Sequence, residues 1–211
     1  MKGFHAPIIA LAGIASIAMI TWRRSPVRAA YTPAPQPQPY PSPAIPHAPS
    51  RMELMTLIAD QARAIGLHPA LAIAFADRES QLDPNAEGDK EWPNKNNGDN
   101  YRRFVLQSPK FTNNPWRNQP ELWHSYGLFQ LLAPFHLEGH EHPHTLLHPV
   151  INAQRGVRAV KHAVDLSSGD LYEARRRYVG CGPGTACDSN PAQRQRIDSA
   201  WQQTLQKWSI V

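Results

Sequence analysis

The chain has only two cysteines, no acidic residue among its first 50 positions, and neither an internal repeat nor a run of strand-like alternation. Without repeats or strand signals, an all-helical or mainly helical domain remains. The first 50 residues hold four basic residues, Lys2, Arg23, Arg24 and Arg28. These account for most of the formal charge of +5, because the remainder has 18 Lys and Arg against 17 Asp and Glu. This near balance removes the electrostatic support for a nucleic-acid partner.

Residues 6–22 form an uncharged segment rich in Ala, Ile and Gly, preceded by Lys2. The segment has no polar stripe at helical period, so a signal sequence or membrane anchor is favoured over a helix packed in a core. Val27 and Ala29 suit cleavage after Ala29. Arginines directly after the apolar run are unusual in a cleaved leader, and by the positive-inside rule they argue against export. We still expect export to the periplasm or cell envelope, with residues 1–29 either cleaved or kept as an inner-membrane anchor.

A proline-rich linker, residues 30–49, follows this leader. Eight prolines occur between positions 31 and 49, and they favour an extended, polyproline-like spacer over a folded element. With 211 residues in all, the chain can bury one sizeable core. We therefore expect a single domain over residues 50–211.

Helix signals begin where the linker ends. Ser50 and Glu53 form a capping-box pattern before apolar residues at helical spacing, and Gly66 ends this first helix. Pro69 suits the first turn of a second helix, which runs on to Glu79. The domain therefore opens with two consecutive helices.

Three further helical patterns occupy residues 149–166, 170–179 and 191–208. The clearest apolar stripe belongs to the first of them and consists of Val150, Ala153, Val157, Val160 and Val164. Residues 87–120 are rich in Asn, Asp, Lys, Pro and Gly, and they predict a long irregular insertion, with room for a short hairpin or helix of its own.

Glu79 is the first candidate for chemistry. It lies at the end of an apolar helix, where both burial and the negative end of the helix dipole disfavour its charged form. A carboxyl group held neutral in this way can act as a general acid. From helix position alone, an ordinary solvated carboxylate paired with Arg78 or a downstream Lys remains the favoured interpretation.

Four segments that follow one another along the chain favour the catalytic interpretation of Glu79 over the solvated carboxylate. They are Glu79-Ser80 with Pro84 and Ala86, then Ser125 to Gln130 (Ser-Tyr-Gly-Leu-Phe-Gln), then Pro149 to Gly156 with Asn152, then Tyr178 before Gly182-Pro183-Gly184. Together, over residues 51–185, they resemble the catalytic core of the lytic transglycosylases, lysozyme-like enzymes that cleave peptidoglycan glycan strands. The resemblance implies a lysozyme-like fold.

The resemblance also implies roles for single residues. Glu79 would be the only general acid and base. Ser125, Tyr126 and Gln130 would contact the sugar, Tyr126 by stacking on a ring, and Tyr178 would orient Glu79 or the departing sugar oxygen. Without the resemblance, a helix cap at Ser125, a solvated turn residue at Gln130 and a core aromatic at Tyr178 are the simpler interpretations.

These roles imply lytic cleavage of the MurNAc–GlcNAc bond. Common glycosidases need a second carboxylate as nucleophile or base, and the sequence does not place Asp83 or Asp89. With assistance from the substrate's N-acetyl group, Glu79 alone would protonate the leaving oxygen and then take the C6 hydroxyl proton as a 1,6-anhydro ring closes. The alternatives are a muramidase that uses water, and an inactive peptidoglycan-binding component of an envelope-spanning secretion, conjugation or phage machine.

The chain departs from the family pattern at two places. Tyr178-Val179-Gly180-Cys181 stands where Tyr-Asn-Ala-Gly is usual, so an amide that would bind substrate is absent. The 46 residues from Glu79 to Ser125 also exceed the usual gap.

Cys181 and Cys187 flank the Gly-Pro-Gly turn, and export favours a disulfide between them over two free thiols. Without further ligands, the two cysteines make a poor zinc site.

Histidines and tryptophans supply the remaining candidates. The loop over residues 136–148 holds His136, His140, His142, His144 and His148, and imidazoles can bind a metal. With no cysteine nearby and no H-E-x-x-H helix, we expect no metal and no other cofactor. Further stacking candidates are Trp92, Trp116 and Trp123, with core positions as the alternative.

Overall fold

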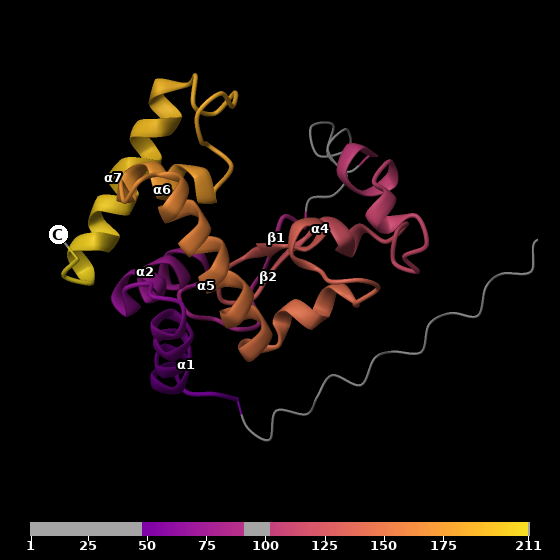
Figure 1. Ribbon diagram of the computed structural model, residues 1–211, viewed down its shortest axis with the longest axis horizontal. Coiled ribbons are helices and arrows are strands. Elements are labelled where there is room, and N and C mark those ends of the chain that lie inside the picture. Colours follow the sequence, from indigo (N-terminus) through magenta and orange to yellow (C-terminus); the bar gives the residue numbers. More distant parts are fainter. Residues whose placement is uncertain (1–47, 91–101, 211) are drawn as a thin grey trace, which may run out of the picture. The chain divides into compact units, whose positions relative to one another are not determined.

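The computed structural model describes residues 48–90 and 102–210. This part of the chain is mainly helical, as expected, with one small sheet (Figure 1). The leader, most of the linker and Trp92 lie outside the described residues. Over residues 48–90 and 102–210, no helix combines the length and apolar character that crossing a membrane requires.

The first two helices are α1 (Arg51–Ala64) and α2 (Pro69–Ser80). Ser50 Oγ accepts a hydrogen bond from the Glu53 amide at 3.2 Å, and Glu53 Oε2 accepts one from the Ser50 amide at 2.7 Å. The predicted capping box is therefore confirmed. Every residue of α2 from Leu71 to Asp77 is buried, which makes α2 the central helix of the core.

The three later helical predictions are also confirmed. They correspond to α5 (Pro149–Leu166), α6 (Leu171–Tyr178) and α7 (Pro191–Lys207). Helix α5 packs against α1, α2 and α6, and α7 packs against α2 and α6 (Figure 1). In the predicted apolar stripe, Ala153, Val157 and Val160 are buried, but Val150 is 48% exposed. The prediction for Val150 is wrong because this residue lies in the first turn of α5, outside the packed face.

A buried carboxylate, that of Asp77, joins α7 to α2. It accepts hydrogen bonds from Lys207 Nζ at 2.5 Å, Trp208 Nε1 at 3.1 Å and Arg51 Nη2 at 2.8 Å. Burial raises the pKa of Asp77, but these hydrogen bonds outweigh it and hold the pKa below its usual value. The C-terminal helix is thus attached to the helix that carries Glu79.

A three-stranded antiparallel sheet has the order β1 (Glu87–Gly88), β2 (Ser125–Tyr126) and β3 (Leu131–Leu132). Gly88 is opposite Ser125, and Ser125 is opposite Leu132. Strands of two residues are too short to produce alternation in the sequence, so the pattern did not predict them. The segment predicted as an irregular insertion therefore begins with a strand of this sheet.

Short helical turns occupy the described rest of that segment and the residues just after it. They are a π-helix, η1 (Arg102–Leu106), and two 3-10 helices, η2 (Pro109–Phe111) and η3 (Pro120–Trp123). Each contributes a fully buried side chain to the core, namely Val105, Phe111 and Leu122. Helix α4 (Ala133–His136) and the 3-10 helix η4 (Pro143–Leu147) follow the sheet.

Candidate active site

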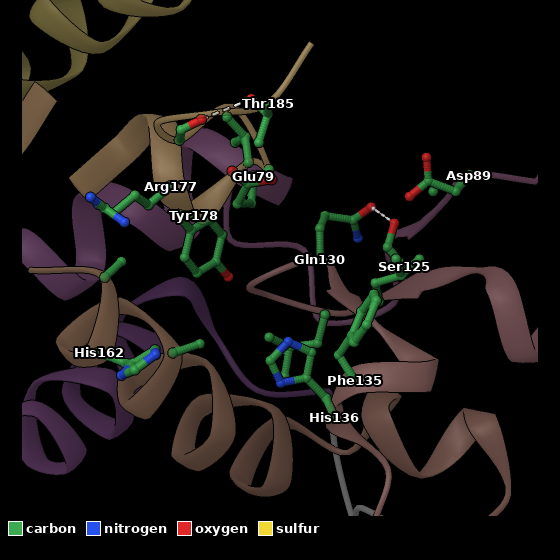
Figure 2. Close-up of a pocket in the computed structure, with 18 of the residues that line it drawn as sticks. Glu79, Asp89, Ser125, Gln130, Phe135, His136, His162, Arg177, Tyr178 and Thr185 are labelled. Carbon is green, nitrogen blue, oxygen red and sulfur yellow. Dashed lines mark hydrogen bonds between the residues drawn. The ribbon is translucent and has the colours of Figure 1, made fainter. Parts of the chain in front are cut away.

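One cavity of about 930 Å³ collects most of the residues singled out in the sequence. Glu79, Ser125, Gln130 and Tyr178 all line it, together with Gly182 and Pro183 of the Gly-Pro-Gly turn. Figure 2 shows Glu79 and Tyr178 on one side and Ser125 and Gln130 on the other. The volume of the cavity lies within the range of about 300 to 1,000 Å³ that is typical of ligand sites.

Glu79 is fixed at the end of α2 by its neighbour Ser80. Ser80 Oγ donates a 2.9 Å hydrogen bond to the backbone carbonyl of Leu128, which lies in the turn between β2 and β3. This bond joins two segments 48 residues apart. The first two motifs of the sequence are thereby brought together.

The third motif, on α5, holds the same turn. Asn152 is fully buried; its Oδ1 accepts from the Phe129 amide at 2.9 Å, and its Nδ2 donates to the carbonyls of Tyr126 and Leu146 at 2.8 and 2.7 Å. One turn further along the helix, Gly156 packs on Phe129 so closely that an added Cβ would lie 2.2 Å from its ring. Asn152 and Gly156, four residues apart on α5, therefore hold the turn between β2 and β3 rather than substrate.

Gln130 and Ser125 hydrogen-bond to each other across the sheet. Ser125 Oγ donates to Gln130 Oε1 at 3.1 Å, while Gln130 Nε2 donates to the carbonyls of Ala86 and Gly127, both at 3.1 Å. Gln130 has a left-handed backbone with φ of 46°, which directs the chain back into β3. Both side chains face the cavity with their hydrogens already engaged, so any sugar contact would be to their oxygens.

Tyr178 lies at the end of α6 and packs edge-on against Phe75, with ring centroids 5.1 Å apart. Its hydroxyl donates a 2.6 Å hydrogen bond to the Phe129 carbonyl. Burial raises the pKa of this hydroxyl well above its usual value, and the nearby negative charge of Glu79 raises it further. Tyr178 therefore stays protonated. Its hydroxyl orients the turn between β2 and β3. The sequence had suggested the Glu79 carboxylate as one possible partner of this hydroxyl.

Arg175 is a partner of Glu79 that the sequence did not suggest. Its Nη1 donates to Glu79 Oε1 in an ion pair whose side chains are 9% and 15% exposed. A guanidinium beside a carboxylate stabilises the charged form, which opposes the effects expected from burial and the helix dipole. The only signal in the sequence was an arginine three residues before Tyr178, and nothing local distinguished it from its neighbours.

The stacking role predicted for Tyr126 is wrong. Its ring is fully buried, and its hydroxyl donates to the Glu121 carbonyl at 2.9 Å, so neither face can reach a sugar. Trp123 is also buried and stacks with Phe104, while Trp116 packs against His142. The core interpretation applies to these three rings.

Other side chains in the cavity were not predicted to act there. Phe135 is 53% exposed and lines the cavity, which makes it the aromatic ring best placed for a sugar face. His136 and His162 line it as well (Figure 2). Burial, with Lys110 and Arg155 adding to it, lowers the pKa of His136 to about 4. His136 is therefore a neutral imidazole at pH 7.

Asp89 also lines the cavity, whereas Asp83 is exposed outside it. Asp89 follows β1 directly and has a left-handed backbone with φ of 55°. In Figure 2 it lies on the far side of Gln130 from Glu79. The cavity thus contains two carboxylates, although only one was assigned from the sequence.

Cys181 and Cys187 form the predicted disulfide, with their Cα atoms 4.9 Å apart. The loop between them carries Gly182, Pro183 and Thr185 into the lining of the cavity. Thr185 Oγ1 donates to the Gly182 carbonyl at 2.8 Å, which tightens the turn (Figure 2). The disulfide therefore closes a loop that forms part of the wall of the site.

Among residues 48–90 and 102–210, no three His, Cys, Asp or Glu side chains gather as metal ligands would. His136 faces the cavity, while His142 and His144 lie side by side, with ring centroids 4.7 Å apart, and pack on Trp116 and Tyr126. Comparisons of the chain with protein-family models, curated proteins and solved structures found no match.

Proposed function

We propose that residues 50–211 form a lysozyme-like peptidoglycan lytic transglycosylase that leaves 1,6-anhydro-MurNAc ends. One observation carries the proposal: four segments spread over about a hundred residues converge so that Glu79, Gln130 and Tyr178 line a single cavity. The converging side chains include a carboxylate at the end of a buried helix. A proton donor in a cleft of this size is what glycoside cleavage requires.

In this proposal, Glu79 protonates the glycosidic oxygen and then accepts the proton of the muramoyl C6 hydroxyl as the C6 oxygen bonds to C1. Phe135 offers a ring face to a sugar, and the turn held by Asn152 and Tyr178 keeps Gln130 at the cleft. The partner is a peptidoglycan glycan strand. Export to the periplasm or cell envelope is part of the proposal, and the leader that would direct it lies outside the described residues.

A second candidate function follows from Asp89. A muramidase needs a second carboxylate, as nucleophile or as base for water, and the two carboxyl groups must flank the scissile bond. Because Asp89 and Glu79 line the same cavity, hydrolysis is the alternative reaction. The lytic reaction is preferred because it needs no second carboxylate, and because Asp89 is exposed and lies on the far side of Gln130 from Glu79 (Figure 2).

Mass analysis of products from purified sacculi tests the proposal. Wild-type protein should release fragments with anhydromuramic ends, each lighter by one water than the corresponding hydrolysed fragment. Glu79→Gln should release none while remaining folded, because the amide keeps the shape of the side chain but cannot transfer the proton. Reducing ends as the main product would move the assignment to the muramidase. No release by wild-type protein that binds sacculi would move it to the inactive binding component.

A further inference from the structure

Arg175 is a buried cation among aromatic rings. It lies in the middle of α6 and is only 7% exposed. Its guanidinium carbon is 5.6 Å from the ring centroid of Phe75, 5.6 Å from that of Trp201 and 5.9 Å from that of Tyr178. Phe75 and Trp201 are themselves fully buried, so the guanidinium has a fixed position. Arginine suits such a site because its charge is delocalised and weakly hydrated.

The anionic partner of this cation is Glu79, 96 residues earlier in the chain. The hydrogen bond uses Oε1 of the carboxylate. Among the described residues, none donates a hydrogen bond to Oε2, and the Glu79 side chain as a whole is 15% exposed. One oxygen is therefore held against the core, and the other is accessible from the cavity that Glu79 lines.

We propose that Arg175 is a positioning residue that sets the orientation of Glu79. It fixes Oε1, so that Oε2 is the atom that exchanges protons with the substrate. It also stabilises the carboxylate left behind after Oε2 has given its proton to the leaving oxygen, until Oε2 takes the C6 hydroxyl proton. The catalytic step rests on the proposed function, whereas the fixing of Oε1 by Arg175 does not.

A matched control for Arg175 lies next to it on α6. Arg176 is also largely buried, and its Nη1 donates to both oxygens of Asp198 at 2.8 and 3.0 Å. Asp198 and Arg176 do not line the cavity. Arg176 Nη2 also pairs with Glu173 Oε2 at 3.3 Å. Arg175→Met and Arg176→Met therefore each remove a largely buried arginine and its ion pairing from α6, but only the first removes a partner of Glu79.

The experiment has two readouts on the full chain. The first is the conformation of the Glu79 side chain, measured from NMR scalar couplings. Because Arg175 holds Oε1, this side chain should keep one rotamer in wild-type protein and in Arg176→Met, and should lose it in Arg175→Met. This readout does not depend on any activity.

The second readout is glycan cleavage as a function of pH. Arg175→Met should lower kcat roughly tenfold to hundredfold with KM within about threefold, and the loss should be present at every pH at which wild-type protein is active. Arg175→Lys, which keeps the charge, should recover part of the rate and serves as the second variant if Arg175→Met does not fold. Arg176→Met should keep kcat within about threefold, even if its melting temperature falls equally.

Equal losses of kcat in Arg175→Met and Arg176→Met, or a rise in activity in Arg175→Met, would overturn the positioning role. A Glu79 side chain that is as fixed in Arg175→Met as in wild-type protein would also overturn it. If wild-type protein cleaves no glycan but Glu79 loses its single rotamer in Arg175→Met, the proposed function fails and the coupling between Arg175 and Glu79 stands.

Discussion

The hydroxyl of Tyr178 donates a 2.6 Å hydrogen bond to the backbone carbonyl of Phe129. This bond connects the end of α6 to the turn between β2 and β3, across 49 residues. Phe129 also receives support from Asn152, which accepts its amide hydrogen. The turn that carries Gln130 is thus held on both sides, by α5 and by α6.

Tyr178→Phe should remove this support without opening the core. We expect a stability loss of about 1 to 3 kcal/mol from the unpaired carbonyl, and a rate of glycan cleavage lowered roughly tenfold to hundredfold as the turn shifts. Tyr126→Phe is the matched control, because Tyr126 also donates to a backbone carbonyl, that of Glu121, but is buried away from the cavity. Turnover and thermal melting of both variants provide the measurement. Equal rates in the two variants would reduce Tyr178 to a core aromatic.

Asp89→Asn should distinguish the two reactions. In a lytic transglycosylase the second carboxylate is dispensable, so we expect cleavage within about threefold of wild type and unchanged anhydro ends. Asp83→Asn is the control, because Asp83 is exposed outside the cavity. Rates and product masses are compared on the same glycan strands. A loss of a hundredfold or more in Asp89→Asn alone would contradict the one-carboxylate mechanism.

His136 should make the fold sensitive to mild acid. Burial lowers its pKa to about 4 from an ordinary value of 6.5, so between these values the unfolded chain binds the proton that the folded chain does not. Stability should therefore fall as pH decreases from about 6.5 to about 4. In His136→Gln this part of the slope should disappear, whereas in His162→Gln, which changes an exposed histidine of the same cavity, it should remain. Melting temperatures measured across this pH range check the prediction, and parallel slopes in all three proteins would refute it.

Removing the disulfide should affect binding more than chemistry. The Cys181→Ala, Cys187→Ala double variant loses the closure of a loop whose ends are six residues apart, which should cost about 2 kcal/mol of stability. Because Gly182, Pro183 and Thr185 line the cavity while Glu79 lies on α2, we expect KM to rise several-fold and kcat to change little. Reductant should bring wild-type protein to the same values and leave the variant unaffected. A fall in kcat with constant KM would show that the loop acts on the reaction itself.

The sequence by itself determined the helices and the candidates for chemistry. Capping at Ser50, Pro69 in the first turn of α2 and the apolar period of α5 act within a few residues, so their consequences can be read locally. Glu79 was recognisable because its neighbours form a linear motif. The proximity of Cys181 and Cys187 in the chain also favoured their pairing.

Only the tertiary structure decided which residues share the cavity. Arg175 pairs with Glu79 across 96 residues, and no local pattern separates it from Arg176, which pairs with Asp198 instead. The burial of Tyr126 depends on how the β2–β3 turn packs against η4 and α5. Such contacts arise when whole elements bury their apolar faces, and the free energy that selects them is spread over the core. Spacing along the chain therefore predicts the helices, while packing decides the chemical environment of each side chain.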